Sequence, residues 1–171
     1  YSLLLMSISQ HSTEGVQITQ QNQLLLDLSL FSDLQYNFHC GPLVSFNEAT
    51  KRMNCQLALH VALEEFFGLA LPKYLRSKEL FYNRYFLQTI HRVTQPIETM
   101  QEFDFTQARR GDIFFFSKTA TAYARRYHLA VYLGEKSFFH AVQHHGFVLW
   151  SVDEFVASKH YSFWHGVRRV K

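Results

Sequence analysis

The sequence predicts an α+β domain in which helices precede an antiparallel sheet of about five to six strands. Two patterns lead to this fold class. Apolar residues recur at helical spacing between residues 55 and 93, whereas they alternate at strand spacing from residue 112 to residue 170. Because the two patterns occupy separate parts of the chain, the layout differs from the alternating order of α/β folds. The 171 residues suit a single domain with its own hydrophobic core.

The N-terminal part of the chain has the weakest pattern. Residues 1–35 are rich in Gln and Ser and are interpreted as an N-terminal extension, with a short strand or helix that covers the core. Residues 36–54 include Gly41-Pro42, a pair typical of a loop. The chain begins with Tyr1 rather than Met, so we expect a trimmed N-terminus, and the compartment and the export route stay open.

A first helix is predicted to begin at Cys55, with Asn54 as its N-cap. Apolar side chains then follow at helical intervals, and Gly68 suits the position just after the last turn. The predicted helix is therefore about thirteen residues long. Residues 74–93 repeat the pattern with aromatic and charged residues and predict a second helix, which residues 94–110 connect to the sheet.

The remainder of the chain predicts strands joined by short turns. Gly134-Glu135 is the expected turn of a hairpin. Ser151 and Glu154 resemble a capping box and predict a short helix through Ala157. The helices are expected to pack on one face of the sheet. The predicted strands are 112–117, 127–133, 137–142, 147–152 and 161–170.

Composition argues against several classes of function. The net charge of +3 is small, which favours a solvated surface over a nucleic-acid interface. No apolar run reaches about eighteen residues, so no membrane span is expected. The histidines do not form a compact ligand motif, so we expect no metal. We also expect no other cofactor, and we favour a monomer. The arginine pairs, interpreted as solvated, are Arg109-Arg110, Arg125-Arg126 and Arg168-Arg169.

Cys55 is a candidate nucleophile because it stands at the start of a predicted helix. The helix dipole and the free N–H groups there favour a thiolate, and the same N–H groups stabilise a developing oxyanion. The alternative is a small apolar residue that faces the core. The other cysteine, Cys40, has no predicted helix start beside it and is interpreted as a structural thiol, although one disulfide between the two is arithmetically possible.

His128 and His140 are candidates for a base and its orienting partner. Strand alternation places His128 on one face with Ala130 and Tyr132. If the hairpin turn centres on Gly134, His128 lies directly opposite His140, and side chains so paired are roughly 5.5 Å apart at Cβ. One imidazole then acts as the base while the other fixes its tautomer. The alternative is one satisfied core histidine and one solvated histidine at an edge.

Several segments around these residues follow the order of a known family. They are Asn54-Cys55-Gln56-Leu57 with the apolar helix after it, Gly111-Asp112-Ile113-Phe114-Phe115-Phe116, His128-Leu129-Ala130-Val131-Tyr132-Leu133-Gly134, and Phe138-Phe139-His140-Ala141. In order and in the step between the two histidines, they resemble the NlpC/P60 cysteine peptidases, which are papain-like cell-wall endopeptidases. The resemblance covers roughly residues 36–170. It implies a papain-like fold with the nucleophile helix packed on the sheet, and a triad of Cys55, His128 and His140.

The resemblance also implies residues beside the nucleophile. Tyr36 occupies the place of an upstream tyrosine whose hydroxyl assists the oxyanion, and Asn54 and Gln56 flank Cys55 where the family shapes its substrate pocket. The family usually has Asp-Cys-Ser-Gly here, so Asn54, Gln56 and Leu57 depart from the pattern, which bears on specificity. The implied substrate is a peptidoglycan stem peptide, cleaved through a thioester, and the implied location is outside the cytoplasm.

Other functions stay open beside the peptidase. The same fold serves amidases, deamidases and acyltransferases that act on protein or lipid substrates, although the related acyltransferases place histidine before cysteine, the reverse of the order here. A third possibility is a catalytically inert domain that binds the cell wall or a partner. The presence of Cys55, His128 and His140 together argues against the inert domain.

Overall fold

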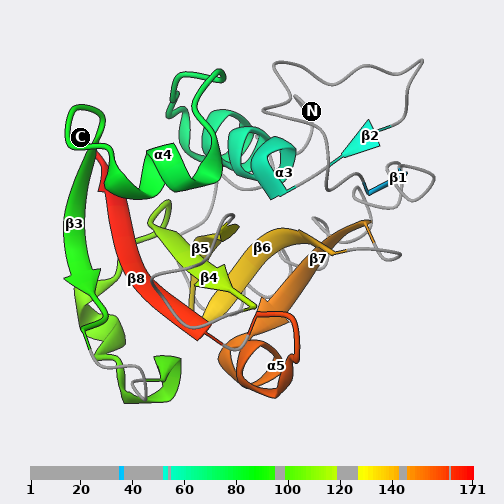
Figure 1. The fold of residues 1–171 in the computed structure, drawn as a ribbon, viewed down its shortest axis with the longest axis vertical. Coiled ribbons are helices and arrows are strands. Elements are labelled where there is room, and N and C mark those ends of the chain that lie inside the picture. Colours follow the sequence, from blue (N-terminus) through cyan, green and yellow to red (C-terminus); the bar gives the residue numbers. More distant parts are fainter. Residues whose placement is uncertain are drawn as a thin grey trace.

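The computed structural model describes residues 35–36, 52–53, 55–94, 99–118, 127–142, 146–161 and 163–171. Their main element is a six-stranded antiparallel sheet with the strand order β3-β8-β4-β5-β6-β7 (Figure 1). Strands β4 to β7 form a meander, and β8 returns to pair with the free side of β4. The predicted α+β fold is confirmed. The strands are β3 (Leu87–Arg92), β4 (Ile113–Ser117), β5 (His128–Gly134), β6 (Ser137–Val142), β7 (Gly146–Ser151) and β8 (Phe163–Val170).

Helices cover both faces of the sheet. Figure 1 shows α3 (Cys55–Val61) and α4 (Ser77–Tyr82) on one side and α5 (Val152–Ala157) on the other. Two short 3₁₀ turns, η3 (Met100–Glu102) and η4 (Phe105–Gln107), precede β4, and η3 packs with α5. The expectation that helices pack on one face alone is wrong. Since β4 is buried along its whole length, both of its faces need an apolar cover.

The first helix begins at Cys55, as predicted, and continues to residue 67. Its second half is a π-helix, η2 (Ala62–Phe66). Gly68 follows with a φ of +63°, a left-handed conformation that glycine adopts without steric cost. The Leu69 N–H then donates to the Leu63 carbonyl at 2.9 Å and closes the helix end. The apolar face of the helix packs against β5 and β6, the strands that carry the two candidate histidines.

The predicted second helix over residues 74–93 is wrong in its second half. Only α4 is helical, and Leu87–Arg92 forms the edge strand β3, paired with β8. The Asn83 side chain accepts hydrogen bonds from two following backbone N–H groups and turns the chain. The buried Arg168 guanidinium donates to the carbonyls of Phe81, Asn83 and Leu87, the last at 2.9 Å. These contacts satisfy backbone groups that a continuous helix would have paired internally.

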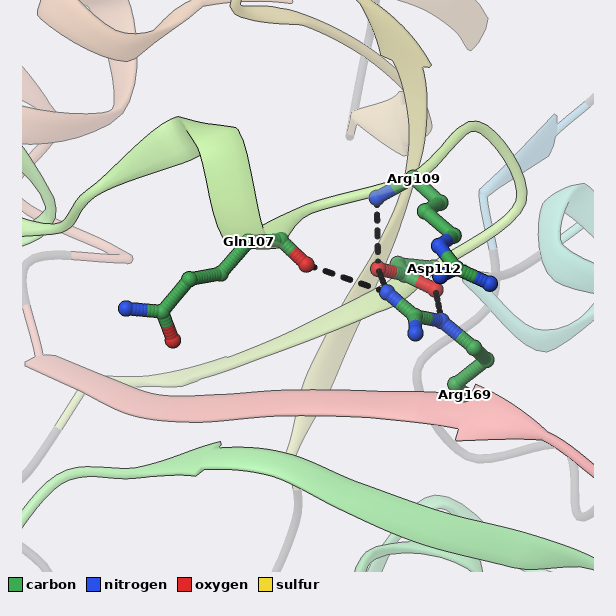
Figure 2. A network of polar contacts seen from close by, with 4 residues as sticks. All are labelled: Gln107, Arg109, Asp112 and Arg169. Carbon is green, nitrogen blue, oxygen red and sulfur yellow. Dashed lines mark hydrogen bonds and ion pairs between the residues drawn. The ribbon is translucent and has the colours of Figure 1, made fainter.

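Asp112 anchors the turn that leads into β4, as Figure 2 shows. Its carboxylate is 1% exposed and accepts two hydrogen bonds from Arg169, at 2.7 and 2.8 Å, and one from the Arg109 N–H at 2.8 Å. Arg169 also donates to the Gln107 carbonyl at 3.0 Å. The interpretation of Arg168-Arg169 as a solvated pair is therefore wrong, because Arg168 is buried and Arg169 forms a bidentate ion pair.

The β5–β6 hairpin is present as predicted, but its turn lies one residue later than expected, at Glu135-Lys136 rather than Gly134-Glu135, and its register is shifted. Glu135 and Lys136 both have positive φ, of 51° and 56°, as the two central residues of a type I′ turn require. Val131 pairs with Phe139, and the ladder is irregular close to the turn, between Tyr132 and Gly134. The same register, continued along the ladder, places His140 opposite the residue at position 130. The direct opposition of His128 and His140 is therefore wrong, and His128 lies on the diagonal.

The remaining local predictions divide into those confirmed and those outside the described residues. The capping box at α5 is present, since the Ser151 N–H donates to Glu154 Oε1 at 3.0 Å and the Glu154 N–H donates to Ser151 Oγ at 3.4 Å. Within the region interpreted as a loop, β2 (Arg52–Met53) pairs in parallel with β1 (Gln35–Tyr36). The extension over residues 1–34 and the N-cap Asn54 lie outside the described residues. No helix in the described part of the chain is long and apolar enough to cross a membrane.

Candidate active site

Cys55 is positioned by the helix that it begins. It is the first residue of α3, is half-buried, and carries a thiol. Its Sγ lies 4.0 Å from the carbonyl oxygen of Tyr127, the residue immediately before β5. Helix α3 packs on β5 and β6 through its apolar face, so the start of this helix meets the end of the sheet at which His128 begins β5.

His128 and His140 form the hydrogen bond that the sequence predicts. His128 Nε2 lies 2.8 Å from His140 Nδ1, and the two rings meet edge to face, at 79° with centroids 5.1 Å apart. The diagonal placement suits this contact, because diagonal neighbours on one face of a sheet are within reach of long side chains. The Nδ1 atom of His128 is left on the side away from His140, as a base that acts on another group requires.

Burial keeps both imidazoles neutral. His128 is 7% exposed and His140 is 0% exposed. Burial lowers the pKa of His128 to about 3, because the charged form loses its hydration. Burial also lowers the pKa of His140 well below its ordinary value, and the charge of a protonated His128 lowers it further. At neutral pH the pair therefore carries one proton on each ring and no net charge.

Aromatic side chains surround the second histidine. The centroids of Trp150 and Phe155 lie 4.5 and 4.7 Å from the His140 ring. If His128 is to keep a lone pair at Nδ1, its Nε2–H donates to His140, and His140 then carries its own proton at Nε2. Within the described residues this buried Nε2 has no hydrogen-bond partner, and aromatic side chains pack around the ring that carries it. Contacts of N–H groups with aromatic faces are weakly stabilising.

Tyr161 is a site residue that sequence reasoning missed. Its ring stacks on His128, with centroids 3.9 Å apart and planes at 18°. Burial and, to a lesser degree, the charge of the Cys55 thiolate raise the pKa of Tyr161 to about 12. Tyr161 is therefore a neutral phenol that lies close to both the candidate nucleophile and the candidate base. Position 161 fell within a predicted strand, and no local pattern connects it with residues 55 and 128.

Tyr127, also missed, anchors the start of β5. Its backbone N–H donates to Ser77 Oγ at 3.2 Å, and its ring packs against Phe81 and His165, with centroids 4.8 and 4.6 Å away. His165 Nε2 in turn lies 2.6 Å from Ser117 Oγ. These buried contacts fix the position of Tyr127, whose carbonyl contacts Cys55 and whose next residue is His128. Burial also raises the pKa of the Tyr127 phenol.

The three residues expected at the oxyanion or substrate pocket have different outcomes. Gln56 is 6% exposed, and its side-chain Nε2 donates to the Leu75 carbonyl at 2.6 Å, so its amide ties α3 to the segment before α4. The backbone of Tyr36 pairs with Met53, two residues before Cys55. The side chain of Tyr36 and all of Asn54 lie outside the described residues, so their roles stay predictions.

A comparison with protein families identifies the family of the chain. The model of the NlpC/P60 family matches residues 48–165, a span that begins just before the helix of Cys55 and ends within β8. The chain belongs to the NlpC/P60 family. Membership supports a function of the cysteine-peptidase type in general. Within the described residues, no group of three or more His, Cys, Asp or Glu side chains gathers as metal ligands would.

The solved structures that are similar to this chain include an NLP/P60 family protein. It is described as similar to a lipoprotein of the NLP/P60 family from Staphylococcus aureus subsp. aureus Mu50, and it is 23% identical to this chain, with a TM-score of 0.46. The match covers 88% of this chain and 41% of that chain, so the present chain spans less than half of that protein. The comparison with curated proteins found no match.

Proposed function

We propose that this NlpC/P60 protein is a cysteine amide-bond hydrolase with Cys55 as nucleophile, His128 as base and His140 as the residue that orients the base. The observation that carries the proposal is the 2.8 Å hydrogen bond between His128 Nε2 and His140 Nδ1, next to the helix that Cys55 begins. It supplies the base and orienting group that an activated thiol needs. Membership of the family is consistent with these roles.

The proposed reaction begins with proton transfer from the Cys55 thiol to His128 Nδ1. The thiolate attacks the amide carbonyl carbon, and the backbone N–H at the start of α3 stabilises the oxyanion. The imidazolium of His128 then protonates the leaving amine as the C–N bond breaks, and a thioester remains on Cys55. Water, deprotonated by His128, attacks the thioester, releases the carboxylic acid and restores the thiol.

The low pKa of His128 shapes the first step. Because burial lowers this pKa to about 3, the imidazole of the resting site is neutral and can accept a proton. The imidazolium that forms when Cys55 transfers its proton is therefore short-lived, and it loses this proton to the leaving amine. His140, itself kept neutral, accepts the hydrogen bond from His128 Nε2–H and holds the ring in the tautomer that leaves Nδ1 available.

We propose a peptidoglycan stem peptide as the substrate, on the resemblance to cell-wall endopeptidases. Purified peptidoglycan is digested, and the fragments are analysed by mass spectrometry. Wild type is expected to release peptide fragments, while C55A and H128A lose roughly 10²–10⁴-fold or more in rate. C40A is the matched control, because it removes the only other cysteine, and it should retain activity.

The same experiment separates the alternatives. Full activity of C55A would contradict cysteine catalysis. No fragments from wild type, combined with Cys55-dependent release of ammonia or of a labelled amine from protein substrates, would keep the mechanism and reject the cell-wall substrate. No reaction of Cys55 with a thiol-directed probe near neutral pH would favour the inert binding domain.

A further inference from the structure

We propose that Tyr161 is a positioning residue of this site, and that its aromatic ring both fixes the plane of the His128 imidazole and stabilises the imidazolium formed during the reaction. The inference rests on the proposed function, because it gives His128 the role of the base. Tyr161 lies between α5 and β8, in a segment to which no role has been given so far.

The geometry constrains His128 from two directions. Tyr161 covers one face of the imidazole, at 3.9 Å between centroids and 18° between planes. His140 approaches the edge, with the 2.8 Å hydrogen bond at Nε2. A face contact prevents the ring from tilting and an edge contact prevents it from rotating, so the two together direct Nδ1 toward a single position. Neither contact alone achieves this.

Tyr161 is itself held firmly. It is 8% exposed, and its ring packs against Trp150 of β7 and Phe155 of α5, with centroids 5.9 and 6.4 Å away. The Tyr161 and His140 rings are also nearly perpendicular, with centroids 6.0 Å apart. The phenol lies close enough to Cys55 for the thiolate to influence its ionisation. One side chain from the far end of the chain therefore contacts both histidines and lies near the nucleophile.

The stack addresses the main electrostatic difficulty of the site. Burial opposes a positive charge on His128, yet proton transfer from Cys55 creates that charge. The face of an aromatic ring attracts a cation, and this attraction is larger where water is excluded. Among the described residues, the titratable groups around the stack are His140 from β6, Cys55 from α3, Tyr161 itself and His160, whose ring centroid lies 6.2 Å from that of Tyr161. Trp150 and Phe155 contribute apolar aromatic surface. Tyr161 thus offsets part of the penalty of burial.

The test measures how readily Cys55 loses its proton to His128. Iodoacetamide alkylation of Cys55 is followed by mass spectrometry near pH 7 and near pH 10, on the full chain. Near pH 10 solvent ionises the thiol directly, so the ratio of the two rates reports proton transfer within the protein and cancels changes in access to the thiol. A purely structural role of Tyr161 would lower stability and leave this ratio unchanged.

Removal of the ring is expected to lower the ratio. Y161L, and Y161M should Y161L fail to fold, are expected to reduce it by roughly two- to tenfold. Y161F keeps the ring and is expected to stay within about twofold of wild type. The matched control is Y132L, which removes a similarly buried tyrosine, 6% exposed, from the same strand as His128 and should keep the wild-type ratio.

The outcomes distinguish this inference from the proposed function. If H128A lowers the ratio while Y161L and Y161M keep it, the role of Tyr161 is wrong and the catalytic pair stands. If H128A also keeps the ratio, the proposed function itself is wrong. If Y161F lowers the ratio as much as Y161L does, the hydroxyl is responsible, which would overturn the role of the ring.

Discussion

The two faces of the sheet differ in composition and contribute different parts of the candidate site. The α3 face is largely aliphatic, with leucine and alanine side chains from the helix packed on leucine and valine from β5. The α5 face is largely aromatic, with phenylalanine, tryptophan and tyrosine side chains gathered over β4, β5 and β6. Cys55 belongs to the first face, whereas the His128–His140 pair is packed among the aromatic rings of the second.

This division has a chemical reason. The proposed nucleophile, Cys55, needs a rigid helix start, which aliphatic packing of a helix on a sheet provides. The proposed base, His128, needs a dry environment that still tolerates a brief positive charge, and aromatic rings provide both low polarity and an attractive face. The candidate site therefore lies at the start of β5, where the Tyr127 carbonyl contacts Cys55 and the next residue, His128, packs on the aromatic side.

The largest expected effect comes from a cavity in each face. F155A on the aromatic face and L63A on the aliphatic face should each cost about 2–5 kcal/mol of unfolding free energy, measured by urea denaturation, because both side chains are fully buried. They should differ in chemistry. F155A removes a neighbour of His140 and should also reduce the rate of Cys55 alkylation near neutral pH, whereas L63A should not.

Both variants are compared at a temperature at which each remains folded by circular dichroism. Equal effects of the two substitutions on alkylation would contradict the division of labour between the faces. An effect of L63A alone would place the environment of the base on the helix side.

The sequence predicts the elements that local patterns determine and misses those that depend on residues distant in the chain. The helix at Cys55 and the capping box of α5 are local patterns and are present as predicted, and the hairpin turn after Gly134 lies within one residue of its predicted place. The apolar residues of 83–92 fit a helix or a strand equally, and only pairing with β8 and the Arg168 contacts select the strand. Such a choice depends on residues distant in the chain, so a local pattern could not make it.

The site was predictable in its chemical groups and less so in its surroundings. The Cys55, His128 and His140 set follows from a helix start and a hairpin. The diagonal placement of the histidines depends on an irregularity of the ladder between Tyr132 and Gly134, which residue types do not reveal. Tyr161 stacks on His128, although His128 precedes β6 and Tyr161 follows β7 in the sequence. Alternation and spacing therefore give no signal for this contact.

A moderate effect is expected from acid. Burial lowers the pKa of His165 to about 4, so below pH 6.5 the unfolded chain takes up a proton that the folded protein does not. Stability from this histidine is complete above its ordinary pKa and is lost as the pH falls toward 4. Between about pH 7 and pH 5 it should decrease by roughly 1–2 kcal/mol.

The control for this prediction is H165Q, which keeps a side chain able to hydrogen-bond Ser117 and does not titrate. Urea denaturation of wild type and H165Q at both pH values gives two slopes, and the contribution of carboxylates cancels in their difference. The slope of H165Q should be shallower. Identical slopes would mean that His165 is accessible to protons in the folded state.

The smallest expected effect is a gain of stability at His60, on the aliphatic face. His60 is 3% exposed, and neither ring nitrogen has a hydrogen-bond partner among the described residues. Burial lowers its pKa, as it does for the paired histidines of the aromatic face, but no hydrogen bond from a described residue offsets the lost hydration of its ring. H60L should therefore raise the unfolding free energy by about 1 kcal/mol and leave Cys55 alkylation unchanged. H140L, which makes the same change of side chain, should instead lower that alkylation sharply. Thermal and urea denaturation check the first expectation, and mass-spectrometric alkylation rates check the second. A loss of stability in H60L would show that contacts compensate the burial of this histidine, and it would contradict the contrast with the hydrogen-bonded His128–His140 pair on the other face.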